Sequence, residues 1–136
     1  MKRWLPILLL VTLAACREPL STERFIRGEG PFVFPVDMSD TTAAYDFDLY
    51  TRVDAMDIPS SVPLRMSWTS PSDSLYTETV YLPLQGRQGV FSMDVYQAYR
   101  ADMRPMEAGE WTLTVSALSQ LPEGFRGLGL VVRKNK

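Results

Sequence analysis

The only cysteine of the chain is the residue whose position most clearly indicates chemistry. Cys16 follows two alanines, an apolar run over residues 4–13, and a positively charged start over residues 1–3. An apolar run of about ten residues is too short to cross a bilayer, which needs about twenty. The order of a positive, an apolar and a small-residue segment is typical of a secretory signal peptide. We therefore expect residues 1–15 to be a signal peptide that is removed before Cys16.

The segment Leu13-Ala14-Ala15-Cys16 resembles the bacterial lipobox, in which the thiol is joined to diacylglycerol before the signal is cleaved. A plain signal peptide with an incidental cysteine, or an uncleaved anchor, are the alternatives. Each buried CH₂ of an acyl chain contributes about 0.8 kcal/mol, so two or three chains make release from the bilayer negligible. In known sorting rules an Asp after the cysteine retains lipoproteins at the inner membrane. Arg17 therefore favours an outer-membrane location in the cell envelope.

Four aspartates form the densest acidic cluster of the sequence, and they permit two interpretations. They are Asp37, Asp40, Asp46 and Asp48. Carboxylate oxygens are the ligands that Ca²⁺ takes, although the spacing does not match an EF-hand loop. In the alternative interpretation they lie on a solvated strand face, with Asp46 and Asp48 beside arginines of neighbouring strands. The second interpretation is favoured, and we predict no metal and no cofactor.

The aromatic residues raise the possibility of a sugar-stacking surface. Trp68 is in phase with Met66 and Leu64, and Trp111 is in phase with Leu113, so both tryptophans are expected in the core. Outward tyrosines such as Tyr50 are the better candidates for a glycan-binding surface, although single exposed aromatics are common on soluble proteins.

Catalysis is not expected from this sequence. There is no histidine, so the commonest general base and the commonest transition-metal ligand are both missing. The serines and the aspartate of residues 70–74 lack a neighbouring base that would activate a nucleophile, and no motif for paired catalytic carboxylates stands out. The net charge of −2 and the absence of a basic cluster argue against nucleic-acid binding.

Short alternating runs separated by turn residues indicate an all-β domain. In the clearest run, residues 45–54, apolar and polar side chains alternate with a period of two, which a helix does not fit. Further runs cover residues 32–36, 62–68, 75–84, 91–95, 101–104, 111–117 and 128–133. About eight strands at this spacing predict an antiparallel β-sandwich of the jelly-roll or immunoglobulin-like type. Short helical pieces are expected only around residues 95–99 and 116–121.

The composition fits one globular domain behind a tether. Of the 136 residues, 46% are hydrophobic and 22% are charged, as in ordinary soluble domains. Residues 17–30 are polar, contain two glycines and show no periodicity, which is typical of a linker. We therefore expect a signal peptide over 1–15, a lipidated tether over 16–30 and a β-sandwich over 31–136.

Several segments together resemble the gliding-motility lipoprotein H family of Bacteroidetes. They are DMSDTTAAYDFDLYTRVD, PLRMSWTSP, ETVYLPL, YRADMRPMEAGEWTLTV and FRGLGLVVRK. The family-like features are the Tyr-x-Leu-Tyr-like core and arginine of residues 45–52, Pro59, the Gly-x-Trp-Thr strand of 109–112, and the ending over 127–134. The connections over 54–61 and 86–89 depart from the usual pattern.

The resemblance implies a lipid-anchored, non-enzymatic accessory lipoprotein of the cell envelope that contacts other envelope proteins connected with gliding or secretion. It brings no catalytic residues to carry over. A glycan-binding surface lipoprotein is the alternative from a different functional class.

Overall fold

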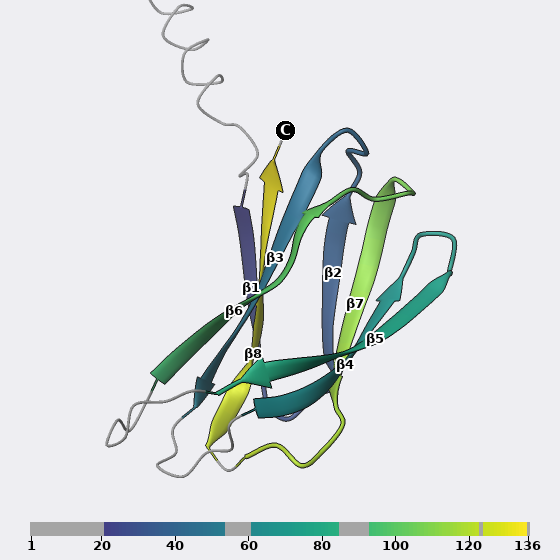
Figure 1. The fold of residues 1–136 in the computed structure, drawn as a ribbon. Helices are drawn as coiled ribbons and strands as arrows, with labels where there is room; N and C mark the ends of the chain where they lie inside the picture. The colour runs from purple at the N-terminus through teal and green to yellow at the C-terminus, as the bar shows by residue number, and fades with distance from the viewer. Residues whose placement is uncertain (1–20, 54–60, 85–92, 123, 136) are drawn as a thin grey trace, which may run out of the picture.

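The computed structural model describes residues 21–53, 61–84, 93–122 and 124–135, and its elements are all β-strands (Figure 1). The strands are β1 (Ser21–Arg27), β2 (Phe32–Met38), β3 (Ala44–Val53), β4 (Ser61–Thr69), β5 (Leu75–Pro83), β6 (Met93–Met103), β7 (Gly109–Ala117) and β8 (Phe125–Asn135). Across the described ranges there is no helix with the length and apolar character needed to span a bilayer.

The strands form two four-stranded sheets in which all pairings are antiparallel. The first, which we call sheet A, has the order β1-β8-β3-β6, and the second, sheet B, has the order β2-β7-β4-β5. This interleaved order is that of an eight-stranded jelly roll, and it differs from the ABED and CFG sheets of an immunoglobulin constant domain. The predicted all-β sandwich of about eight strands is confirmed, and the topology selects the first of the two expected types.

The core lies between the sheets because strand alternation sends every second side chain inward. In β2 the burial alternates residue by residue, and β3, β4 and β7 follow the same rule. The largest fully buried side chains are Phe32, Phe34, Phe47, Met38, Leu49, Leu64, Met66, Leu82, Leu84, Leu113, Leu128 and Val53. The period of two seen in the sequence is therefore the pattern of contact with the opposite sheet.

The predicted tether is too long. Ser21–Arg27 is a strand of sheet A, paired with β8 from Ser21 opposite Arg133 to Arg27 opposite Gly127. In β1 only Phe25 and Ile26 are partly buried, and the other five residues are exposed. That leaves little apolar alternation for sequence analysis to detect. The described domain thus begins at Ser21 and not at Pro31.

Two further sequence predictions need correction. Residues 95–99 lie inside one long strand, β6, which also joins the two separate strands expected over 91–95 and 101–104. Val95, Tyr99 and Met103 face the core at a spacing of four, which fits both a strand and a helix. Residues 116–121 are likewise not helical: β7 ends at Ala117 and a bend follows.

A bulge in β8 shapes one end of sheet A. The register with β3 shifts between Thr51 and Val53, so that Phe125 and Leu128, three residues apart, are both buried. Gly127 lies between them with a φ of 152°, and a Cβ there would approach the carbonyl oxygen of Ile26 to 2.3 Å. The buried Thr51 hydroxyl donates a hydrogen bond to the carbonyl of Gly127. Only glycine fits this position, and the bulge leaves Arg126 exposed.

Candidate functional site

The predicted lipidation site and the signal peptide lie outside the described residues, since the first of these is Ser21. Lipidation of Cys16 therefore stays a prediction. Of the connections expected to depart from the family pattern, 86–89 also lies outside them, and so does 54–61 except for Ser61, the first residue of β4.

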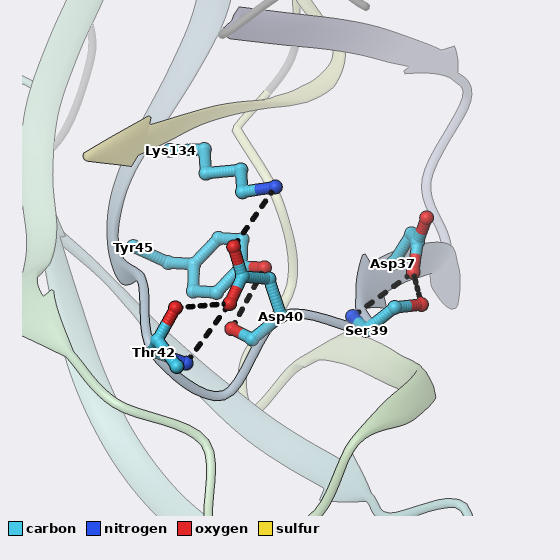
Figure 2. A network of polar contacts seen from close by, with 6 residues as sticks. All are labelled: Asp37, Ser39, Asp40, Thr42, Tyr45 and Lys134. Atoms are coloured by element: carbon cyan, nitrogen blue, oxygen red, sulfur yellow. Dashed lines mark hydrogen bonds and ion pairs between the residues drawn. The ribbon is translucent and has the colours of Figure 1, made fainter. Parts of the chain in front are cut away.

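The first two aspartates of the acidic cluster organise the turn between β2 and β3 (Figure 2). Asp37 accepts hydrogen bonds from the amide and the hydroxyl of Ser39. Asp40 accepts them from the amide of Thr42, at 2.9 Å, and from its hydroxyl, and it lies 3.4 Å from the Lys134 ammonium. The Thr42 hydroxyl, followed by its amide, lowers the pKa of Asp40 to about 2. Both carboxylates thus have local structural roles.

The other two aspartates lie on the outer face of sheet A. Asp48 forms a salt bridge of 2.6 Å with Arg133 on β8, which confirms the expected arginine neighbour across strands. Asp46 accepts a hydrogen bond of 2.7 Å from the amide of Asp102 and one of 2.6 Å from the side chain of Asn135. The Asp102 amide is the main cause of a lowered pKa of Asp46. The described residues contain no group of three or more potential metal ligands.

The serine-rich segment is a structured turn between β4 and β5. The Ser70 Oγ accepts a hydrogen bond from the amide of Ser74 at 2.9 Å and lies 3.2 Å from the Ser72 Oγ. The Ser72 hydroxyl donates to Glu107 at 2.8 Å. These hydroxyls hold the turn against the β6–β7 connection.

Both tryptophans lie in the core, as predicted, each with 3% of its surface exposed. They form a T-shaped pair with ring centroids 6.4 Å apart. The Trp68 indole donates a hydrogen bond of 2.8 Å to the Tyr99 hydroxyl, which donates to Glu78. Burial, with a further effect of the hydrogen bond to Glu78, raises the pKa of Tyr99 to about 12. This polar chain links β4 in sheet B, through Tyr99 on β6, to the edge strand β5.

Tyr50 is on the outer face of sheet A, as predicted, and it belongs to an aromatic row. Phe25, Gly129, Tyr50 and Tyr96 are direct partners across β1, β8, β3 and β6. Because Gly129 has no side chain, the ring of Tyr50 leans over it, and a Cβ there would lie 2.1 Å from that ring. Tyr50 stacks on Phe25 at 5.5 Å and on Tyr96 at 5.3 Å between centroids.

The aromatic row forms one wall of a groove of about 800 Å³, which we call the sheet A groove. The groove lies toward the end of β1, beside the β8 bulge. Its charged lining residues are Arg27, Arg52, Arg126, Glu23 and Glu29. Tyr96 at its rim is 63% exposed. Three guanidinium groups, two carboxylates and four aromatic rings in one open groove suit the binding of a partner with polar and apolar parts.

Sequence reasoning found Tyr50 but missed Phe25, Tyr96 and Arg27 as its neighbours. Alternation along a strand indicates which face of the sheet each side chain takes, and this alternation alone predicted that Tyr50 points outward. Which strands are adjacent, and in what register, depends on pairings between residues far apart in the chain. No signal in one sequence gives those pairings.

No protein-family model matches the chain, and no curated protein shows significant similarity to it. The candidate site therefore stands on the geometry above and on the motifs of the sequence.

Proposed function

We propose that this protein is a membrane-anchored accessory lipoprotein of the cell envelope that acts by binding another envelope protein. The lipobox-like segment ending at Cys16 and the resemblance to gliding-motility lipoproteins support the anchor and the envelope location. The residue Arg17 after the cysteine supports a location at the outer membrane. The observation that carries the binding role is the sheet A groove with its aromatic row and arginines.

The geometry of the aromatic row favours a protein partner over a glycan. Stacking on a sugar needs a ring face that is open to solvent. Tyr50 has Phe25 over one face and Tyr96 over the other, so the central ring of the row offers its edge. Tyrosine and arginine are also the residues most enriched at protein–protein hot spots. The resemblance suggests that the partner belongs to the machinery of gliding or protein secretion.

The binding role is tested by crosslinking and pull-down from intact envelopes. Tyr96→Ser combined with Arg27→Glu removes a ring and reverses a charge in the groove, and we expect recovery of the partner to fall about tenfold or more. Val33→Ser is the matched control, since Val33 is 48% exposed on sheet B. Equal losses of the partner in both variants would overturn the proposal. So would saturable binding of a glycan from a panel to the parent protein and to Val33→Ser, if the groove variant does not bind that glycan.

The anchor is tested separately. Cys16→Ser should leave an unprocessed precursor that incorporates no labelled fatty acid, because the acylated thiol is gone. Normal maturation of this variant would contradict the lipoprotein assignment.

A further inference from the structure

Four described strands lie at sheet edges, and three of them are protected against pairing with another chain. β2 has Pro35 at its centre, which cannot donate a backbone hydrogen bond. β1 carries Glu23, Arg24 and Arg27. β6 has register shifts in its pairing with β3 and a positive φ at Asp102. Proline, charge and bulges are the devices that block strand addition.

The fourth edge, β5, has few of these devices. Its nine residues pair with β4 in unbroken register and have no other strand partner in the described chain. Proline occurs only at its last position, and Leu75 and Tyr81 are each 66% exposed. Its one charged residue, Glu78, is already bound by Tyr99 and Arg100, so an added strand would bury no unpaired charge there.

An apolar pocket opens beside the start of this edge. It measures about 200 Å³, and its walls include Trp68, Trp111, Tyr76 and Met106. Tyr76 is the second residue of β5, and its ring lies 6.2 Å from that of Trp111. Met106 on the rim is 81% exposed. The volume suits one large side chain and is small for a free organic ligand.

The charge around the pocket is positive. Arg104 lines it and is exposed, whereas Arg100 is paired with Glu78. A segment entering the pocket therefore meets a guanidinium that favours an acidic residue near the apolar anchor.

We infer that β5 accepts an extended segment of a partner protein as an added strand, with one apolar side chain of that segment in the pocket beside Tyr76 and an acidic residue near Arg104. A residue opposite Tyr76 on an added strand shares its face at about 5 Å, which places it at the pocket. In such complexes the main chain supplies affinity and side-chain pockets supply specificity. The inference rests on the proposed function only in that both require a protein partner.

The test places a photoreactive residue at Thr77 on β5 and, as matched control, at Thr114 on β7. Both positions flank Ser67 in one row of the outer face of sheet B; Thr77 is exposed on the edge strand, and Thr114 is partly exposed two strands further in. We expect full-length lipoprotein in intact envelopes to crosslink to a partner segment from Thr77 and not from Thr114. Crosslinking that is equal at both positions, or that joins two copies of this chain, would overturn the inference.

A third photoreactive position, Tyr96, separates this inference from the proposed function. Crosslinks from Tyr96 alone would leave groove binding in place and overturn strand addition at β5. The absence of crosslinks from both Thr77 and Tyr96 would overturn both the inference and the proposed function.

The captured segment is then synthesised and titrated against the full-length protein. Removal of the expected signal peptide takes away Trp4 and leaves Trp68 and Trp111, which both line the pocket, so their fluorescence reports its occupancy. Replacing the apolar anchor of the peptide by alanine, or introducing Arg104→Glu, should weaken binding about tenfold or more. Unchanged affinity in both cases would show that the pocket and its charge are not used.

Discussion

Gly129 leaves the space over which the ring of Tyr50 leans between Phe25 and Tyr96. A Cβ at this position would lie 2.1 Å from the ring, so Gly129→Ala must displace Tyr50 and disturb the stacked row. We expect the free energy of unfolding to fall by about 1–3 kcal/mol, measured by urea denaturation.

The Tyr50→Ala background provides the control for this substitution. With the ring removed, the three atoms closest to the added methyl group are gone, and the further loss caused by Gly129→Ala should be clearly smaller. Equal losses in the two backgrounds would show that the close approach of ring and glycine does not limit stability.

The lowered pKa of Asp40 predicts how the free energy of unfolding depends on pH. Its pKa falls from 3.8 to about 2 on folding, chiefly because Thr42 donates hydrogen bonds to it, so the folded state binds the proton more weakly than the unfolded state. The stability that Asp40 contributes is complete above about pH 4 and is lost as the pH falls toward 2. In Asp40→Asn the free energy of unfolding, measured by urea titration from pH 5 to 2, should fall less steeply with acid. A slope equal to that of the parent chain would contradict the assigned role.

At the scale of residues, the sequence correctly predicted which face of a sheet these aromatic side chains take, but not which side chains lie beside them on neighbouring strands. The core positions of Trp68 and Trp111 and the outward position of Tyr50 followed from strand phase. The groove did not, because Phe25 reaches Tyr50 only through the pairing of β1 with β8. The face that a side chain takes follows from the residues next to it in its own strand. A site on a sheet also needs neighbouring strands, which pair residues that are far apart in the sequence.

At the scale of elements, one buried hydroxyl contacts the bulge of β8. Thr51 is fully buried, and its hydroxyl donates to the carbonyl of Gly127. Thr51→Val keeps the shape of the side chain and leaves that carbonyl without this donor, so we expect a loss of about 1–3 kcal/mol in the free energy of unfolding.

Chemical denaturation measures the loss, and Thr114→Val is the matched control because Thr114 lies partly exposed on sheet B. A Thr51→Val variant as stable as the control would show that the hydroxyl does not support the bulge. Because the bulge borders the sheet A groove, the proposed partner should also bind more weakly to Thr51→Val.

Strands with one buried face were the most predictable elements. β2, β3, β4 and β7 bury alternate side chains, and each was expected from its period of two. β1 was missed because five of its seven residues are exposed and its apolar residues do not alternate, and β6 was divided because its core contacts recur every four residues. The expected count of eight is right only because the missed strand and the divided strand offset each other.

At the scale of the molecule, the start of β1 and most of the groove lie toward opposite ends of sheet A. Ser21 lies opposite Arg133, and Ala44 lies opposite Asn135, so the start of β1 and the β2–β3 turn are at one end of sheet A. The groove extends from Glu23 to Glu29 and Arg126, so most of it lies toward the other end. Five residue steps from Cys16 to Ser21 reach at most about 17 Å, so a lipid on Cys16 would hold the first end close to the bilayer.

This arrangement predicts a depth order in vesicles. In the lipidated protein, a fluorophore on Thr41→Cys should be quenched more strongly by nitroxide lipids than one on Glu29→Cys, because Thr41 is in the β2–β3 turn and Glu29 lines the groove. Both positions are exposed, so labelling should leave the fold intact. Equal quenching, or the reverse order, would contradict the predicted orientation.

The pairing of β1 with β8 also determines when sheet A can form during synthesis of the chain. The first described strand finds its hydrogen-bond partner only in the last one, and β3 needs the same late strand for one of its two edges. Sheet A is therefore incomplete until residues near 130 have emerged from the ribosome. If the chain is exported as proposed, this late closure of sheet A would keep the sheet open until the chain has been translocated.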